Sequence, residues 1–154
     1  MCDIIDPHES QDKVGTVMQR EQLNYFLQQA PFPLLSALCE KISKEAAIEL
    51  IQKPTSQTLL VPVVDPINQG TFISGEVLVS SAIVQVNGVN GWAMVMDENP
   101  ELATSLAVLD GAYAAGMRKL EIVQLAEQGK EAMDSKHADM NARVNSTRVS
   151  FDLL

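Results

Sequence analysis

The fold of this chain is decided between Phe72 and Asp110. The stretch begins F-I-S-G-E-V-L-V-S-S-A-I-V-Q-V (72–86), continues N-G-V-N-G-W-A-M-V-M-D-E-N-P (87–100) and ends in an Ala- and Leu-rich run that closes with L-D (109–110). Asn-Gly pairs tolerate the positive φ angles of a tight turn, and proline fits the first turn of a helix. The order therefore predicts a strand, a hairpin turn, a second strand and a helix.

The first strand of this hairpin, residues 71–86, is longer than the usual strand of about 5–6 residues. A bend or bulge at Gly75 is expected to divide it. Both Asn87-Gly88 and Asn90-Gly91 are assigned to the turn, so the returning strand is predicted over residues 92–96. Asn99 as cap and Pro100 at the first position then start a helix.

Helical spacing precedes the hairpin from Val17 onward, through Met18, Gln22, Tyr25 and Phe26. Pro31 and Pro33 end this helix, since proline lacks an N–H and restricts the residue before it. A second helix is predicted over residues 34–44, whereas residues 45–53 fit both the helical and the strand period. Residues 58–64 are β-rich, and Pro62 assigns them to a sheet edge.

Two amphipathic stretches follow the hairpin. One stripe of side chains continues past Gly111 and Gly116, which are expected to allow close packing or a bend, and it is formed by Leu102, Leu106, Leu109, Tyr113, Met117 and Leu120. Residues 127–148 form the second stretch. We predict an α+β fold, a small antiparallel β-sheet with N-terminal helices and long C-terminal helices. It makes one domain over residues 16–154, after a flexible acidic tail, residues 1–15.

Composition narrows the classes of function. The 154 residues carry a net charge of −9 and a sequence pI near 4.6, which argues against nucleic acid and against an anionic membrane surface. No stretch approaches 18 apolar residues, and the amino terminus lacks the basic and apolar regions of a secretory signal. Cys2 and Cys39 form no metal or redox motif. We expect a cytoplasmic protein without a metal or cofactor.

Positive charge is missing from the middle of the chain. Residues 54–117 contain no Lys or Arg, and their charged side chains are Asp65, Glu76, Asp97, Glu98, Glu101 and Asp110. Such a segment is poorly suited to hold a phosphate. We expect it to borrow reactive groups from a neighbouring protein, and a basic protein surface is its electrostatic complement.

Four side chains are candidates for chemistry or contact. Glu76 fits a general base if it is buried, but no second catalytic group lies near it in the sequence, so we favour a structural carboxylate or a pair with a partner's Arg. Asp110, if buried, needs a paired donor. His137 is in phase with apolar residues and is assigned to helix packing or subunit contact. Trp92 is either an interface anchor or a core residue. No residue is assigned a catalytic role.

These motifs together resemble the PhnG family, the small G subunit of the bacterial carbon–phosphorus lyase core complex. F-I-S-G-E-V-L-V-S-S-A carries the family's Gly-Glu pair at Gly75 and Glu76. The hairpin and helix that follow match at Gly91, Trp92, Val95, Ala103, Ala107 and Asp110. The tail matches at Val144, Thr147 (or Ser146), Val149 and Phe151, with Arg148 alongside. The resemblance covers residues 17–154.

The resemblance implies a role in phosphonate catabolism. In such systems the G, H, I and L subunits together form α-D-ribose 1-methylphosphonate 5-triphosphate from ATP and methylphosphonate and release adenine, and the J subunit later cleaves the carbon–phosphorus bond. The implied partners are the I subunit first, then H and J. One departure stands out, because Asp97-Glu98-Asn99 replaces a Gly-Arg-Asp-like run of the family. This exchange weakens the case for direct anion binding and leaves a scaffold role.

Three hypotheses remain open at this stage. The first is an accessory subunit of the phosphonyl-transferase complex, in which the isolated chain is not catalytic. The candidate structural or partner-contact residues are then Gly75, Glu76, Gly91, Trp92, Asp110, His137 and Arg148. The second is an enzyme that uses Glu76 and Asp110 directly. The third is a stand-alone binding module, which includes a homodimer of the isolated chain.

Overall fold

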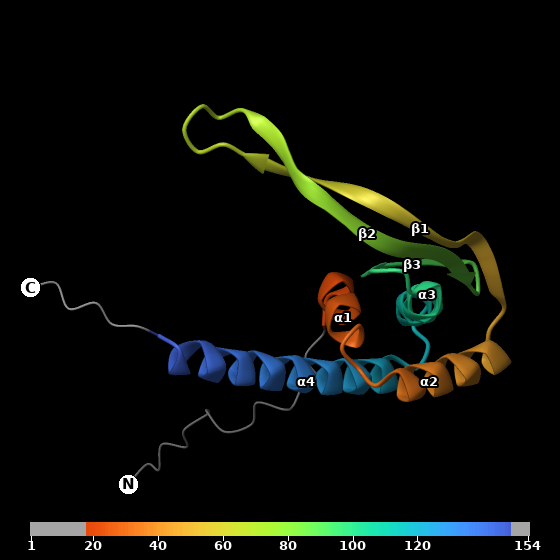
Figure 1. Cartoon of the computed structure of the whole chain (residues 1–154). Coiled ribbons are helices and arrows are strands. Elements are labelled where there is room, and N and C mark those ends of the chain that lie inside the picture. Colours follow the sequence, from red (N-terminus) through yellow and green to blue (C-terminus); the bar gives the residue numbers. More distant parts are fainter. Residues whose placement is uncertain (1–17, 149–154) are drawn as a thin grey trace, which may run out of the picture.

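The computed structural model describes residues 18–148 and has four helices and a three-stranded sheet. The helices are α1 (Arg20–Leu27), α2 (Phe32–Glu45), α3 (Pro100–Ala114) and α4 (Lys119–Ser146); the strands are β1 (Ile48–Val64), β2 (Thr71–Val86) and β3 (Val89–Met96). The sheet is antiparallel in the order β1-β2-β3 (Figure 1). The α+β prediction is confirmed. The predicted tail, residues 1–15, lies outside the described residues.

The hairpin turn is tighter than expected. Asn87 (φ 48°) and Gly88 (φ 82°) form a two-residue type I′ turn, and Val89 already pairs with Val86. Asn90-Gly91 therefore lies inside β3, so its assignment to the turn was wrong. Gly91 instead allows close packing, since a Cβ atom there would lie 2.1 Å from the carbonyl oxygen of Ala107 in α3.

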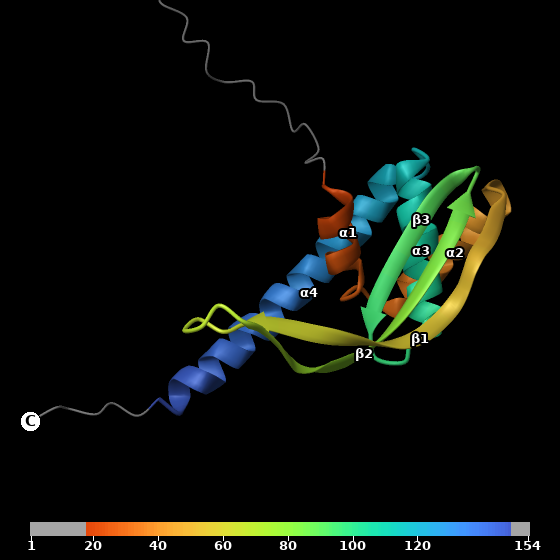
Figure 2. The same cartoon turned by 90° about the horizontal axis from the view of Figure 1, so that it is seen from above.

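The core surrounds α3, which packs on one face of the sheet and against the buried sides of α1, α2 and α4. β2 contributes Ala82, Val84 and Val86 to this face, and β3 contributes Ala93 and Val95. Side chains alternate along a strand, so the residues between these point to the opposite face. All four helices lie on the core side or beside the sheet, and no helix covers the opposite face (Figures 1 and 2). We call this opposite face the open face.

The outer parts of β1 and β2 extend together away from α1, α2 and α3 (Figure 1). We call residues 57–78, the outer part of this hairpin, the arm. β1 is a single 17-residue strand. It takes up residues 48–53 of the region that fitted both periods, whereas Glu45 ends α2. The strand lies at the sheet edge, as Pro62 predicted. The register of the two strands shifts next to Gly75, between Val61 and Pro62, yet β2 continues through this irregularity. Gly75 therefore does not divide the strand.

Helix boundaries differ from the predictions at two proline or glycine sites. Pro33 lies in the first turn of α2, where a missing N–H costs no helical hydrogen bond. The stripe expected to run from Leu102 to Leu120 is interrupted, because α3 ends at Ala114 and Gly116 adopts φ 80°. Leu120 consequently lies on another helix, with 72% of its surface exposed. The start at Asn99 and Pro100 is confirmed, and the Asn99 side chain accepts a hydrogen bond from the Leu102 N–H.

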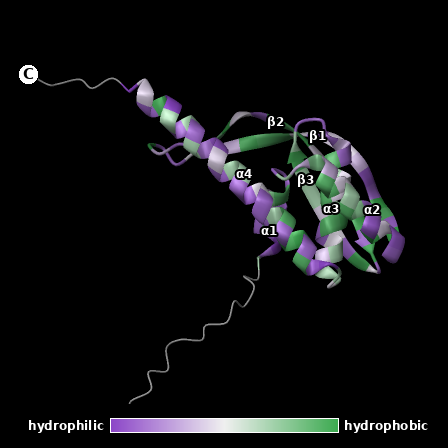
Figure 3. Cartoon of the chain, turned by 90° about the horizontal axis from the view of Figure 1, so that it is seen from below, coloured by the Kyte–Doolittle hydropathy of each residue, from purple (hydrophilic) through white to green (hydrophobic). Residues whose placement is uncertain are grey.

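α4 packs on α1 only through its first half. Gly129 is the contact, since a Cβ atom there would lie 2.0 Å from the carbonyl oxygen of Phe26. Beyond this point the helix is largely hydrophilic, in contrast to α3 (Figure 3), and its last turns project from the body on the same side as the arm (Figure 1). None of the helices over residues 18–148 is both long and apolar enough to cross a membrane.

Candidate functional site

A row of polar side chains on α1 covers the free edge of β3. Arg20, Asn24 and Gln28 are spaced four residues apart and therefore lie on one face of the helix. Their side chains donate hydrogen bonds to the carbonyl oxygens of Asn90 (3.1 Å), Trp92 (3.4 Å) and Met94 (3.4 Å), respectively.

The spacing of this row matches the spacing of the strand. Four helical residues rise about 6 Å, and two strand residues rise about 6.6 Å, so each donor meets the next outward-facing carbonyl. An uncovered strand edge is a template for pairing with other chains. The side chains of α1 therefore bind the outward-facing carbonyl groups of β3 and prevent another strand from pairing with this edge.

Asp110 completes this arrangement from α3. The residue is nearly buried, 3% exposed, and its carboxylate accepts two hydrogen bonds from Arg20, Nε to Oδ1 at 2.9 Å and Nη2 to Oδ2 at 2.5 Å. The Trp92 N–H donates to Oδ2 at 3.0 Å. The hydrogen bond to Asp110 raises the pKa of Arg20, against the opposing effect of burial. The donor that a buried Asp110 required is thus Arg20.

A cavity of about 430 Å³ lies beside this ion pair, between α1 and β3. Tyr25, Trp92 and Met94 form its apolar lining, next to the polar row of α1. Tyr25 and Trp92 are 55% and 49% exposed, so neither is a core residue. Trp92 pairs with Ile83 across the strands and shares the open face with it. The cavity therefore lies at the rim of the open face.

The sequence candidates fall into three places. Gly91, Trp92 and Asp110 meet at the cavity and at the contact of β3 with α3. Gly75 and Glu76 lie on the arm. His137 and Arg148 are exposed, on the projecting half of α4 and just after its end. The arrangement does not bring Glu76 and Asp110 together.

The distance between the two acids follows from the strand register. Trp92, which donates to Asp110, pairs with Ile83, and Glu76 lies seven residues further along β2. At about 3.3 Å per residue, Glu76 lies roughly 23 Å along the strand from Ile83. A general acid and base acting on one substrate must both lie within hydrogen-bond reach of it. Glu76 and Asp110 cannot act as such a pair in this arrangement.

Sequence reasoning missed Arg20, Asn24 and Gln28. The helical spacing was assigned to Met18, Gln22, Tyr25 and Phe26, whereas Leu23 and Leu27 are the fully buried residues of α1. The available signal was the four-residue spacing of the polar side chains. A second signal was the absence of cations over residues 54–117, because a cationic partner for Asp110 must then come from outside that segment.

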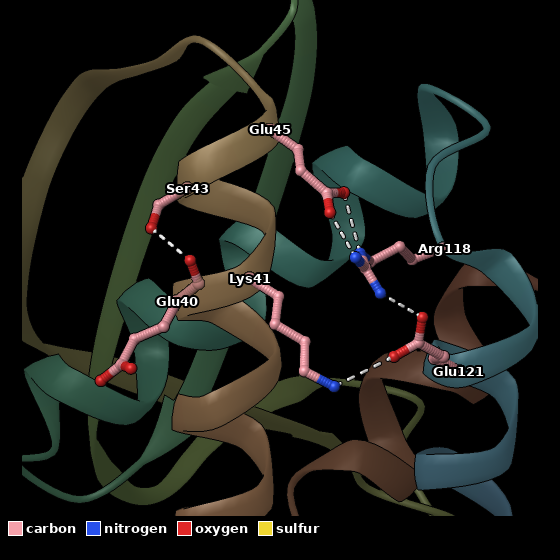
Figure 4. A network of polar contacts seen from close by, with 6 residues as sticks. All are labelled: Glu40, Lys41, Ser43, Glu45, Arg118 and Glu121. Carbon is pink, nitrogen blue, oxygen red and sulfur yellow. Dashed lines mark hydrogen bonds and ion pairs between the residues drawn. The ribbon is translucent and has the colours of Figure 1, made fainter.

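A second polar network joins α2 to the start of α4 (Figure 4). Arg118 donates to both oxygens of Glu45 and to Glu121, and Lys41 pairs with Glu121 at 3.6 Å. The hydrogen bonds from Arg118 lower the pKa of Glu45 below its usual 4.5. This network links two helices. None of its residues lines the cavity beside Asp110.

Neither Cys39 nor a cluster of metal-binding side chains forms a reactive site in the described residues. Cys39 is half-buried against the core, and burial raises the pKa of its thiol to about 11. Over residues 18–148, no three His, Cys, Asp or Glu side chains cluster in a way that would hold a metal ion.

Comparison with known proteins gives one family. The model of a family described as phosphonate metabolism protein PhnG matches residues 18–154. A search of curated proteins finds no significant match to the chain. The match spans every helix and strand, and it includes the cavity, the ion pair and the arm.

Proposed function

Because the chain belongs to the PhnG family of phosphonate metabolism proteins, we propose that it is an accessory subunit of the carbon–phosphorus lyase core complex. In this role it docks on the I subunit first and then contacts H and J in the cytoplasm. The complex forms α-D-ribose 1-methylphosphonate 5-triphosphate from ATP and methylphosphonate and releases adenine. This chain supplies binding surface, and its partners supply the reactive groups.

The arm is the observation that carries this proposal. Large apolar side chains are exposed on both of its faces. Register places Leu59, Val61, Val63 and Phe72 on the open face, and Leu60, Val64, Ile73 and Leu78 on the other. The arm's only charged side chains are Asp65 and Glu76. Contiguous exposed apolar surface that is poor in charge is typical of a protein interface.

The edge of the arm favours contact through its faces. Pro62 lacks the N–H that an added strand would need, and proline at a strand edge discourages pairing with another chain. Side chains rather than backbone groups are therefore offered to the partner. Asp110 also fits an accessory role, because both of its oxygens already accept hydrogen bonds from Arg20 and the Trp92 N–H.

The test removes apolar surface from the arm without touching the core. Leu60→Asp combined with Phe72→Asp alters one exposed side chain on each face, since these side chains are 57% and 52% exposed. We expect binding to a complex of the remaining core subunits to weaken at least 30-fold, because desolvated apolar anchors contribute about 2 kcal/mol or more each. Isothermal titration or interferometry measures this.

Leu120→Asp on α4 is the matched control, since Leu120 is exposed but lies off the sheet. It should bind like the wild-type chain. Adenine release by the remaining subunits at the full rate without this chain would defeat the proposal. Loss of turnover by Glu76→Gln in a complex that still assembles would instead favour a catalytic role for Glu76.

A further inference from the structure

The cavity between α1 and β3 contains more negative than positive charge. Arg20 and Asp110 neutralise each other, and Glu21 also lines the cavity. Among residues 18–148, Glu21 has no ion-pair partner. One cation and two acids leave the cavity with a net charge of −1. A cationic group is the electrostatic complement.

Asn24, which lines the cavity, has one buried polar atom without a partner. Asn24 uses its amide N–H to bind the Trp92 carbonyl, but its Oδ1 is buried and accepts no hydrogen bond from the described residues. An unsatisfied buried acceptor costs about 1–3 kcal/mol. This oxygen has almost no accessible surface, so a donor reaches it only by a rotation that breaks the hydrogen bond to the Trp92 carbonyl, and the oxygen therefore does not select the ligand.

The aromatic lining favours a planar cation over a compact one. Tyr25 and Trp92 both line the cavity and are about half exposed, so their rings are available to a ligand. Aromatic faces attract cations, and a planar guanidinium can also stack on them. Guanidinium carries five N–H donors in a planar fork, which suits a bidentate contact with the Glu21 carboxylate. Ammonium is a compact, strongly hydrated charge and fits this lining less well.

We propose that the cavity receives an arginine side chain of the protein that docks on the open face. The inference rests on the proposed function, and it names the anchor and its chemistry. The cavity and the open face share Trp92 and Met94, so a partner seated on the sheet reaches the cavity directly. Tryptophan, tyrosine and arginine are also the residues most enriched at the energetic centres of interfaces.

The experiment measures binding of the full chain to a complex of the remaining core subunits. Trp92→Ala and Glu21→Lys should each weaken binding by at least 10-fold, and Glu21→Gln should reduce the dependence of affinity on salt. Glu131→Lys makes the same charge change at an exposed site on α4 and should bind like the wild-type chain. Circular dichroism and thermal unfolding check that each variant folds.

A chemical readout identifies the anchor as arginine. Phenylglyoxal modifies accessible arginines, and mass spectrometry locates each modified site. One arginine of the partner should be shielded in the complex with the wild-type chain and modified in the complex with Glu21→Lys. No shielded partner arginine, or a shielded lysine detected by acetylation in its place, would overturn the inference.

The two proposals fail in different ways. Wild-type affinity for Trp92→Ala and Glu21→Lys, together with weak binding of the arm variant, overturns the arginine anchor and leaves the docking function intact. Failure of the wild-type chain to bind the remaining subunits removes both. Binding of free arginine methyl ester to the isolated chain, without an effect of Trp92→Ala on the complex, assigns the cavity to a small cation and also overturns the inference.

Discussion

Asp110 shows how a single residue depends on distant sequence. Its partner Arg20 lies 90 positions earlier, and the side chain of Arg20 remains 45% exposed while that of Asp110 is 4% exposed. Removal of one partner is therefore asymmetric. Loss of Asp110 leaves an arginine that water can solvate, whereas loss of Arg20 leaves a buried carboxylate with the Trp92 N–H alone.

We expect Arg20→Met to destabilise the chain by about 2–3 kcal/mol and Asp110→Asn by about 1 kcal/mol. Urea unfolding followed by circular dichroism measures both. Arg143→Met, at an exposed position in α4, is the control and should lie within about 0.5 kcal/mol of the wild type. Equal costs for Arg20→Met and Asp110→Asn would show that burial of the carboxylate does not set the energetics.

At the scale of elements, two glycines of the same hairpin have opposite roles. Gly91 is where β3 touches α3, since a Cβ atom there would also lie 2.6 Å from the Cα of Gly111. Gly75 has open space where a Cβ atom would be placed. The strand and helix can approach closely only because both contact residues lack a side chain.

We predict that Gly91→Ala destabilises the fold by about 3 kcal/mol, the upper range for overpacking, because backbone atoms must move to admit the methyl group. Gly75→Ala is the matched control and should be neutral or slightly stabilising, since alanine restricts the unfolded chain. Thermal unfolding of both variants tests this. A neutral Gly91→Ala would contradict the close packing of β3 on α3.

At the scale of the whole molecule, the network of Glu45, Arg118, Glu121 and Lys41 links α2 to α4 (Figure 4). The folded-state pKa of Glu45 is lowered, so its contribution to stability is present above its usual pKa of 4.5 and is lost as the pH falls through the lower folded value. Glu45 is exposed, and the contribution is also screened by salt.

We expect Glu45→Gln to lower the urea midpoint at pH 7 by a few tenths of a molar, roughly the effect of an exposed ion pair. The difference from the wild type should shrink as the pH falls below 4.5 and also at 1 M salt. Unfolding curves at pH 7, 4.5 and 3 measure it. Glu131→Gln, the same charge change at an exposed position on α4, controls for the overall charge. A difference that stays constant with pH would contradict the role of the Glu45 carboxylate.

The open face and the arm form one continuous surface of the molecule. Helices cover one side of the sheet, and the other side continues without interruption into the arm (Figures 1 and 2). An isolated two-stranded arm has no core of its own and is marginally stable in water. A partner that packs on it would supply the missing burial.

The sequence by itself determined the local structure. The turn at Asn87-Gly88, the helix start at Asn99-Pro100 and the edge position of the strand with Pro62 all follow from φ preferences and backbone donors, which neighbouring residues decide. The sequence also predicted the α+β class, and its lack of Lys and Arg over residues 54–117 means that any cation near Asp110 comes from elsewhere.

Only the tertiary structure decided which distant groups meet. The pairing of Arg20 with Asp110, the row of α1 on the edge of β3 and the uncovered side of the sheet depend on how elements pack, and periodicity carries no information about which helix lies on which edge. Gly91 illustrates the difference, since its dipeptide resembles a turn but its role is the close approach of α3, a contact between residues far apart in the chain.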